Sequence, residues 1–217
     1  MIADLAAAVA VVEAIDKIEA FADNNGNTVP EEADYSTAGI TGVTAVNIDA
    51  VNAAIDAAIA TDADTAAEIQ TIVDQVIADL ATAAAVVAAI DKIEGYADNN
   101  ANPEPELVDY STAGVTGVTA SNLADVNVAI DALVSGDVDT ASEIQTIVNQ
   151  VIADLAAAAA VVAAIDKVEA YADNNANTVP ELADYSTAGV TGVTAANLVD
   201  VNTAVDALVA GDVNTAA

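Results

Sequence analysis

A period of 75 residues runs through the whole chain and constrains its fold more than any other feature. The segment AIDKIEAFADNN at 14–25 returns as AIDKIEGYADNN at 89–100 and as AIDKVEAYADNN at 164–175. Self-similarity at a fixed period indicates units that stack on their neighbours along the chain. We therefore predict a tandem array, in which neighbouring repeats of the same chain are the first partners of each unit.

Signals for helix starts divide the array into three units, 1–64, 65–139 and 140–217. DTAAEIQ at 64–70 and DTASEIQ at 139–145 place Thr65 and Thr140 three residues before a glutamate, which predicts a capping box. On this division the first unit lacks the first turns of its long helix. The third unit ends at Thr215, where the next long helix would begin, so we expect an excerpt from a longer array.

Each unit is predicted to contain a long, a short and a medium helix, which makes the fold all-α. Between Thr65 and Ala97, large apolar residues recur in steps of four and three, with Ala83 filling one step. This spacing predicts an amphipathic helix of about 33 residues, roughly 50 Å long. No proline interrupts it or its copy from Thr140 to Ala172. We expect both helices to be continuous across a unit boundary and to join the units into an elongated rod.

Punctuation residues predict where the other helices begin and end. Pro105 and its copies Pro30 and Pro180 are expected in the first turn of the short helix, which would end near Ala113. Thr119 is expected to cap the medium helix. The long helix should end at 98–100, with asparagine as a left-handed cap.

A glycine pair follows the short helix in every unit. STAGVTGVTA occurs at 111–120 and 186–195, and STAGITGVTA at 36–45. The spacing of Gly114 and Gly117 also matches the GxxG clamp of some nucleic-acid-binding domains. The negative charge of the chain and the missing P-loop lysine oppose a phosphate-binding role. We predict a helix–helix connector with glycines at positive φ, held on the bundle by Val115 and Val118.

Composition excludes several classes of function. The chain has 35 acidic and 3 basic residues, a formal net charge of −32, and no histidine or cysteine. Such a surface repels nucleic acid and anionic membranes. Ser-His-Asp and Cys-His machinery cannot be built, and the abundant carboxylates favour a solvated acidic face over an acid–base pair. We expect no enzyme, no catalytic residue and no cofactor.

The longest apolar stretch, Leu155 to Ile165, is 11 residues long and ends at Asp166. A membrane-spanning helix needs about 20 apolar residues. The stretch is therefore predicted to be a buried helix segment of a soluble protein, without membrane insertion.

The few aromatic and basic residues are candidates for chemistry. Six aromatic residues could form a carbohydrate-stacking platform, but core packing is favoured because the units contain few other bulky side chains: Phe21, Tyr35, Tyr96, Tyr110, Tyr171 and Tyr185. Lys92 is expected to pair locally with Asp91 or Glu94 rather than to act as a reactive amine.

A calcium loop is the most specific alternative. Asp23, Asn25 and Asn27 occupy positions 1, 3 and 5 of an EF-hand-like register, with Glu31 at 9 and Asp34 at 12. The same register recurs in the other units, at Asp98, Asn100, Asn102, Glu106 and Asp109, and at Asp173, Asn175, Asn177, Glu181 and Asp184. Position 6 lacks glycine, and position 12 lacks the bidentate glutamate. We favour turn formation and helix capping and assign no metal ligand, with calcium left as the alternative.

The segments DYSTAGVTGVTAANL (184–198), DTASEIQTIVNQVIADL (139–155) and IDKVEAYADNN (165–175) resemble tandem Ala-, Val- and Asp-rich repeats of giant adhesin-type proteins of Gram-negative, especially marine, bacteria. The resemblance covers the whole chain and implies a structural extender or stalk, extracellular or on the cell surface. The alternative is a multivalent binding module for a host protein or glycan. A repeated exposed apolar or aromatic patch would favour that alternative, and the sequence shows none clearly.

Overall fold

The computed structural model describes residues 2–213 and contains helices but no strand in that range. The predicted all-α fold is confirmed. The chain divides into two compact units, Met1–Ala88 and Ala89–Ala217. The predicted helix start at Thr215 lies outside the described residues.

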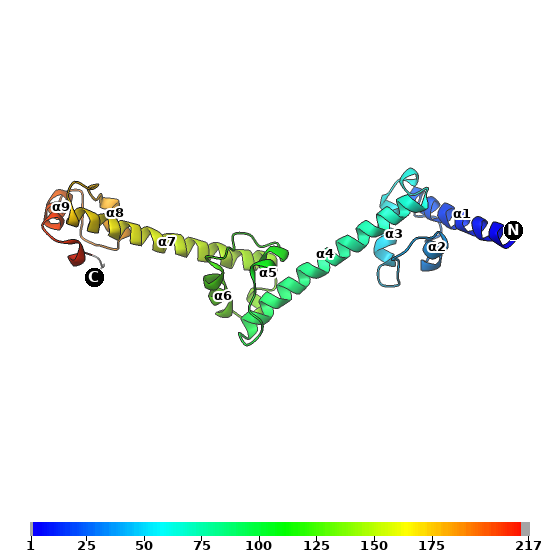
Figure 1. Cartoon of the computed structure of the whole chain (residues 1–217), viewed down its shortest axis with the longest axis horizontal. Coiled ribbons are helices and arrows are strands. Elements are labelled where there is room, and N and C mark those ends of the chain that lie inside the picture. Colours follow the sequence, from blue (N-terminus) through cyan, green and yellow to red (C-terminus); the bar gives the residue numbers. More distant parts are fainter. Residues whose placement is uncertain (1, 214–217) are drawn as a thin grey trace. The chain divides into compact units, whose positions relative to one another are not determined.

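The first unit is built on two long helices and two shorter ones (Figure 1). Its elements are α1 (Ile2–Asp23), α2 (Glu32–Thr37), α3 (Ile48–Ala57), the 3-10 helix η1 (Ala60–Asp62), and α4 (Ala66–Asp98) as far as Ala88.

The second unit begins with the remainder of α4. It continues with α5 (Leu107–Thr112), α6 (Leu123–Asp131), η2 (Ser135–Asp137), α7 (Ala141–Asp173), α8 (Leu182–Thr187), α9 (Leu198–Asp206) and η3 (Ala210–Asp212). The three 3-10 helices were not predicted, because their short AxD and GD segments carry no helical periodicity.

Both predicted long helices are continuous. Each of α4 and α7 has 33 residues and begins one residue after the predicted threonine. Thr140 accepts a hydrogen bond from the backbone N–H of Glu143 at 3.3 Å, and the Glu143 carboxylate accepts from the Thr140 N–H at 3.1 Å. The capping box is thereby confirmed, and it satisfies two of the donors left free at a helix start.

Hydrophobic side chains gather in three clusters along the chain. In the first unit the cluster includes Ile18, Tyr35, Ile55 and Ile69. The second unit has one cluster that includes Ile93, Tyr110, Ile130 and Ile144, and another that includes Val168, Tyr185 and Val205. Helix α7 therefore supplies its first turns to one cluster and its last turns to another.

The predicted starts of the short and medium helices are wrong in detail. Pro105 lies before the N-cap Glu106 rather than in the first turn of α5, because Asp109 accepts the Glu106 N–H at 2.7 Å and starts the helix there. Asn122, not Thr119, is the N-cap of α6. Its side chain folds back, accepting from the Thr119 N–H at 2.7 Å and donating to the Gly117 carbonyl at 3.0 Å.

The left-handed asparagine cap is also wrong. Asn174 follows α7 with φ −156°, and no non-glycine residue has positive φ in the described range. The end of α7 is instead covered by Asn177, whose side-chain amide donates to the Ala170 carbonyl at 2.7 Å. Asn27 and Asn102 do the same at the ends of α1 and α4.

The middle of α7 is exposed, which corrects the prediction that Leu155 to Ile165 forms a buried segment. Leu155 is 38% exposed and Val162 57%, because the core partners of α7 lie near its two ends. By length and composition alone, α4 and α7 could each cross a membrane. Their uncharged middle is only 11 residues long in each helix, about half of what a bilayer core requires.

Candidate functional site

The glycine pairs act as connectors between helices. Gly114 and Gly117 have φ values of 80° and 87°, and the pairs Gly39–Gly42 and Gly189–Gly192 are similar, which confirms the predicted positive φ. Val115 is buried and Val118 half-buried against the second cluster. Both therefore hold the turn on the bundle, as predicted.

A glutamine of the long helix fixes the same turn, and sequence reasoning missed it. The Gln145 side chain accepts from the Thr116 N–H at 2.8 Å and donates to the Thr116 carbonyl at 3.0 Å. Gln70 makes the same pair of bonds to Thr41. The available signal was the glutamine in both EIQ segments. The turn's central amide groups are thus used within the chain rather than offered to a phosphate.

Each unit buries one tyrosine in a polar relay. Tyr110 donates to Asn127 Oδ1 at 2.6 Å, and Asn127 Nδ2 donates to the Pro105 carbonyl at 2.9 Å. Tyr35 with Asn52, and Tyr185 with Asn202, form the same bonds. Burial raises the pKa of the Tyr110 hydroxyl well above its ordinary value, with smaller contributions from Tyr96, Asp109 and Glu104. Core packing of these tyrosines is confirmed.

The other aromatics also pack on the clusters. Phe21 is buried in the first cluster. Tyr96 and Tyr171 are half-buried against the second and third. All six aromatic side chains therefore contribute to packing.

The lysines pair with a different helix from the one predicted. Lys17 Nζ lies 2.6 Å from Asp34 Oδ2 on α2, and Lys167 lies 2.6 Å from Asp184 on α8. Lys92 contacts Asp109 of α5, not its neighbours Asp91 or Glu94. The lysine projects from the long helix toward the short one because Asp109 also caps the short helix and is held there. The ion pair fastens two helices together.

The calcium-loop residues of the first unit are directed to separate partners. Asn25 donates to Asp56 at 3.1 Å, and Asn27 donates to the Ala20 carbonyl at 2.6 Å. Asp34, at position 12, accepts from Lys17 and from the Glu31 N–H. Among residues 2–213, no group of three or more His, Cys, Asp or Glu side chains could hold a metal ion. The arrangement supports capping and turn formation.

One carboxyl pair precedes each long helix in the described structure. A hydrogen bond to Glu143 and the charge of Glu143 raise the pKa of Asp139, while bonds from Thr140 and Asp139 lower the pKa of Glu143. Asp64 and Glu68 form the matching pair. These pairs have the proton-sharing geometry of an acid and a base, but both residues are exposed, and Glu143 is engaged in the capping box.

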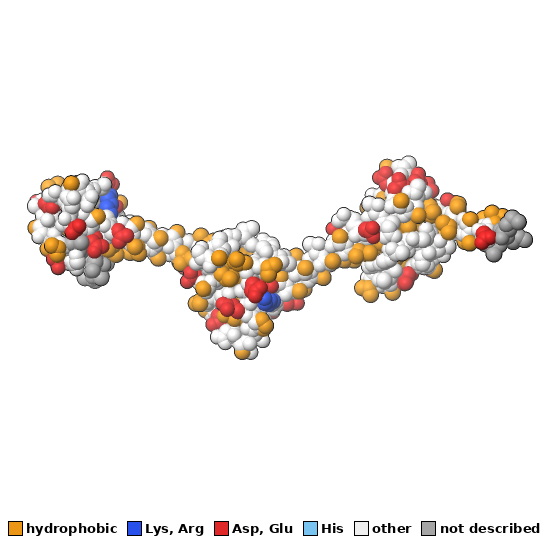
Figure 2. All heavy atoms as spheres, in the orientation of Figure 1, with side chains coloured by type: hydrophobic (Ala, Val, Ile, Leu, Met, Phe, Trp, Pro, Cys, Tyr) orange, Lys and Arg blue, Asp and Glu red, His pale blue; other side chains and the backbone are white. Residues whose placement is uncertain are grey.

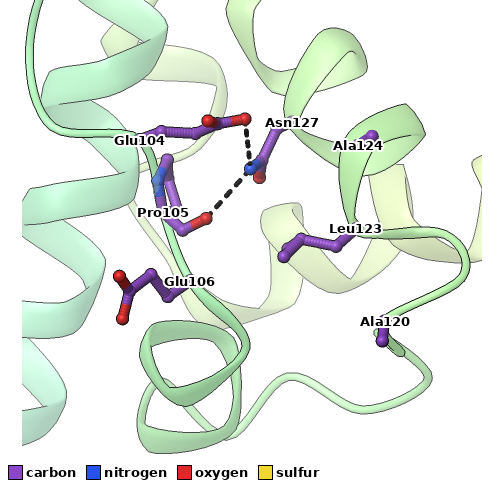
Figure 3. Close-up of a pocket in the computed structure, with 7 residues that line it drawn as sticks. All are labelled: Glu104, Pro105, Glu106, Ala120, Leu123, Ala124 and Asn127. Atoms are coloured by element: carbon purple, nitrogen blue, oxygen red, sulfur yellow. Dashed lines mark hydrogen bonds between the residues drawn. The ribbon is translucent and has the colours of Figure 1, made fainter.

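A shallow pocket of about 290 Å³ lies between the start of α5 and α6 (Figure 3). Its lining consists of Glu104, Pro105, Glu106, Ala120, Leu123, Ala124 and Asn127. Glu104 stands where the other units have valine, and it accepts from Asn127 Nδ2 at 3.0 Å. The carboxylate is therefore tied to the relay of Tyr110, which favours a structural role for it.

In the described part of the chain, every buried side-chain nitrogen and oxygen atom has a hydrogen-bond partner. Polar groups that could have formed a ligand site instead join helices to each other. No protein-family model, curated protein or solved structure matches the chain.

Proposed function

We propose that the chain is a structural extender, made of tandem three-helix units of 75 residues that share long helices. The unit borders follow the sequence division at 65 and 140. The array would space or display other domains of a large adhesin-type protein, extracellular or on the cell surface, without catalysis. Its partners would be neighbouring repeats, and neither nucleic acid nor membrane insertion is involved.

The observation that carries this proposal is the position of α7 in two hydrophobic clusters. Ile144 and Val148 belong to the cluster of Tyr110, whereas Val168 and Ala172 belong to the cluster of Tyr185. A helix that is continuous between two cores resists bending where a loop would flex. Nearest-neighbour coupling of this kind stabilises repeat arrays.

The conserved spacing of the internal contacts supports the same proposal. The ion pairs of Lys17, Lys92 and Lys167 all link residues 17 positions apart. The tyrosine–asparagine bonds also link residues 17 positions apart in each case. Every unit thus repeats one set of joints, as an extender requires, rather than reserving one unit for a ligand.

Small-angle X-ray scattering of the full chain tests the extender. A compact protein of this length would have a radius of gyration of roughly 17 Å. We expect at least about twice that value, and it should change little when salt is added. A value near the compact one would refute the extender.

A repeated exposed side chain keeps the binding module as a second candidate. Ile59, Val134 and Val209, each 75 residues apart, are 62–63% exposed, although the sequence did not clearly show such a patch. On this alternative, the chain would bind a glycan or host protein through several equivalent contacts. A glycan array that detects wild type but not a triple serine variant of these residues would support it.

A further inference from the structure

The long helices carry apolar side chains on their exposed middle turns. In α7, Leu155 and Val162 are exposed, and so is Ala158 between them. Figure 2 shows hydrophobic side chains along this part of the helix. The corresponding residues are exposed in the other long helices, Leu80, Ala83 and Val87 in α4, and Leu5, Ala8 and Val12 in α1. We call these three sets the apolar stripes.

Each stripe continues a row that the chain itself buries. In α7 the row begins with the buried Ile144 and Val148, and Val151 and Ile165 flank the stripe half-buried. The steps along the row alternate between four and three residues, the heptad spacing by which one helix packs on another. Helices of this chain cover the ends of the row. The middle offers the same helix-binding surface to solvent.

Charge restricts which helix can occupy the stripe. Residues 155–165 are uncharged and are bordered by Asp154 and Asp166. In a parallel helix pair, position g faces position e of the next heptad in the partner. With Leu155 at position a, Asp154 would face Ala159 of a second copy, and Asp166 would face Val161. No acid meets an acid, although each copy carries a net charge of −32.

The other stripes obey the same rule. In α4, Asp79 would face Ala84 and Asp91 would face Val86; in α1, Asp4 would face Val9 and Asp16 would face Val11. We propose that the apolar stripes bind the same stripes of a second copy of this chain, as short parallel helix pairs in register. This lateral association goes beyond the extender role and does not require it.

The size of a stripe sets the expected strength. Eleven residues of helix span about 16 Å, and one such contact falls short of the roughly 800 Å² per partner of a standard interface. Association through one stripe should therefore be weak, and engagement of several stripes should strengthen it. A lipid bilayer fits less well, because its hydrocarbon core is about 30 Å thick.

Sedimentation equilibrium of the full chain tests the proposal, in salt that reduces the Debye length to about 3 Å. We expect reversible dimers at high micromolar to millimolar concentration. Leu155→Glu with Val162→Glu places acid opposite acid and should weaken association at least about tenfold. Val128→Glu with Val199→Glu is the matched control, because these valines are exposed on other helices. A monomer at millimolar concentration, or equal weakening by the control, would overturn the proposal.

A cysteine scan tests the register independently of any destabilised variant. The chain has no cysteine, so an introduced thiol can cross-link only to its copy. Ala158→Cys places the thiol at the facing d position, whereas Ala160→Cys points it outward at f. Disulfide dimers should form at least about tenfold faster at 158, with circular dichroism confirming intact helices. Equal rates, or flotation with phosphatidylcholine vesicles by a chain that stays monomeric in solution, would overturn the proposal.

Discussion

The hydroxyl of Tyr110 donates a 2.6 Å hydrogen bond to Asn127 Oδ1, and both side chains are buried. The bond ties α5 to α6 at the centre of the second hydrophobic cluster. Asn127 continues the connection to the Pro105 carbonyl, so one amide fixes both the entry to α5 and the face of α6.

Removing this hydroxyl should destabilise the chain locally. In Tyr110→Phe, Asn127 Oδ1 loses its buried donor, and an unsatisfied buried acceptor costs about 1–3 kcal/mol. Urea unfolding followed by circular dichroism measures the loss. Tyr96→Phe is the control, because Tyr96 is only half-buried, and it should cost less. An equal loss in both variants would contradict the role given to the relay.

The glycine connector gives a second test, with controls inside the chain. Gly117 has φ 87°, and an added Cβ would lie 2.8 Å from Ile152 Cδ1. Gly192 has φ 84° but open space around it, while Gly136 has open space and no positive φ. Gly117→Val should destabilise most, by more than about 1–2 kcal/mol, Gly192→Val less, and Gly136→Val least.

Melting temperatures and glycan binding of these variants should be measured together. If Gly117→Val left the melting temperature unchanged but abolished binding of a ligand, the loop would be a recognition element rather than a connector.

The long helices could be predicted because their signals are local. Thr140, Glu143 and the apolar steps of α7 lie within one segment, and both its continuity and its start were found from sequence. The partners of Lys92 and Gln145 could not be found this way. Each reaches a residue 17 or 29 positions away, and only the folded chain decides which distant segment arrives there.

The exposed middle of α7 was mispredicted for a related reason. Periodicity identifies the apolar face of a helix but does not say whether another segment covers it. The same face is buried at Ile144 and exposed at Leu155. Among the site candidates, the aspartate and asparagine residues were correctly expected to favour turns and caps, but the asparagine cap uses its side chain rather than a left-handed backbone.

The continuity of α7 can be tested with proline. Ala158→Pro removes a helix hydrogen bond and should cost about 3 kcal/mol or more. Ala158→Gly is the control and should cost about 1 kcal/mol. The proline variant should also separate unfolding of the clusters around Tyr110 and Tyr185, which calorimetry would detect as an additional transition. A single unchanged transition would show that the middle of α7 does not couple them.

The interhelical ion pairs predict a pH dependence. Burial raises the pKa of Asp34, but bonds from Lys17 and the Glu31 N–H, together with the charge of Lys17, lower it below the ordinary 3.8. Asp184 is lowered by the same causes through Lys167. A carboxyl group with a lowered folded pKa stabilises above its unfolded pKa, and this contribution disappears as pH falls through the folded value.

Wild type should therefore lose an increment of stability below about pH 4 that Asp34→Asn with Asp184→Asn lacks. Comparison of urea unfolding across this range isolates the increment from the general relief of charge repulsion in acid. Lys17→Gln with Lys167→Gln should remove it as well. Parallel pH profiles for wild type and both double variants would contradict the assignment.

Ions give the last test. A net charge of −32 raises the free energy of the folded chain through self-repulsion, so NaCl should increase the melting temperature by screening. At constant ionic strength, Ca²⁺ and Mg²⁺ should stabilise equally, because Asn102 and Asp109 already bind partners within the chain. Asp98→Ala should then leave the response to Ca²⁺ unchanged. A calorimetric titration that found one saturable Ca²⁺ site per unit, lost from the middle unit in Asp98→Ala, would instead make these loops calcium sites that stiffen the extender.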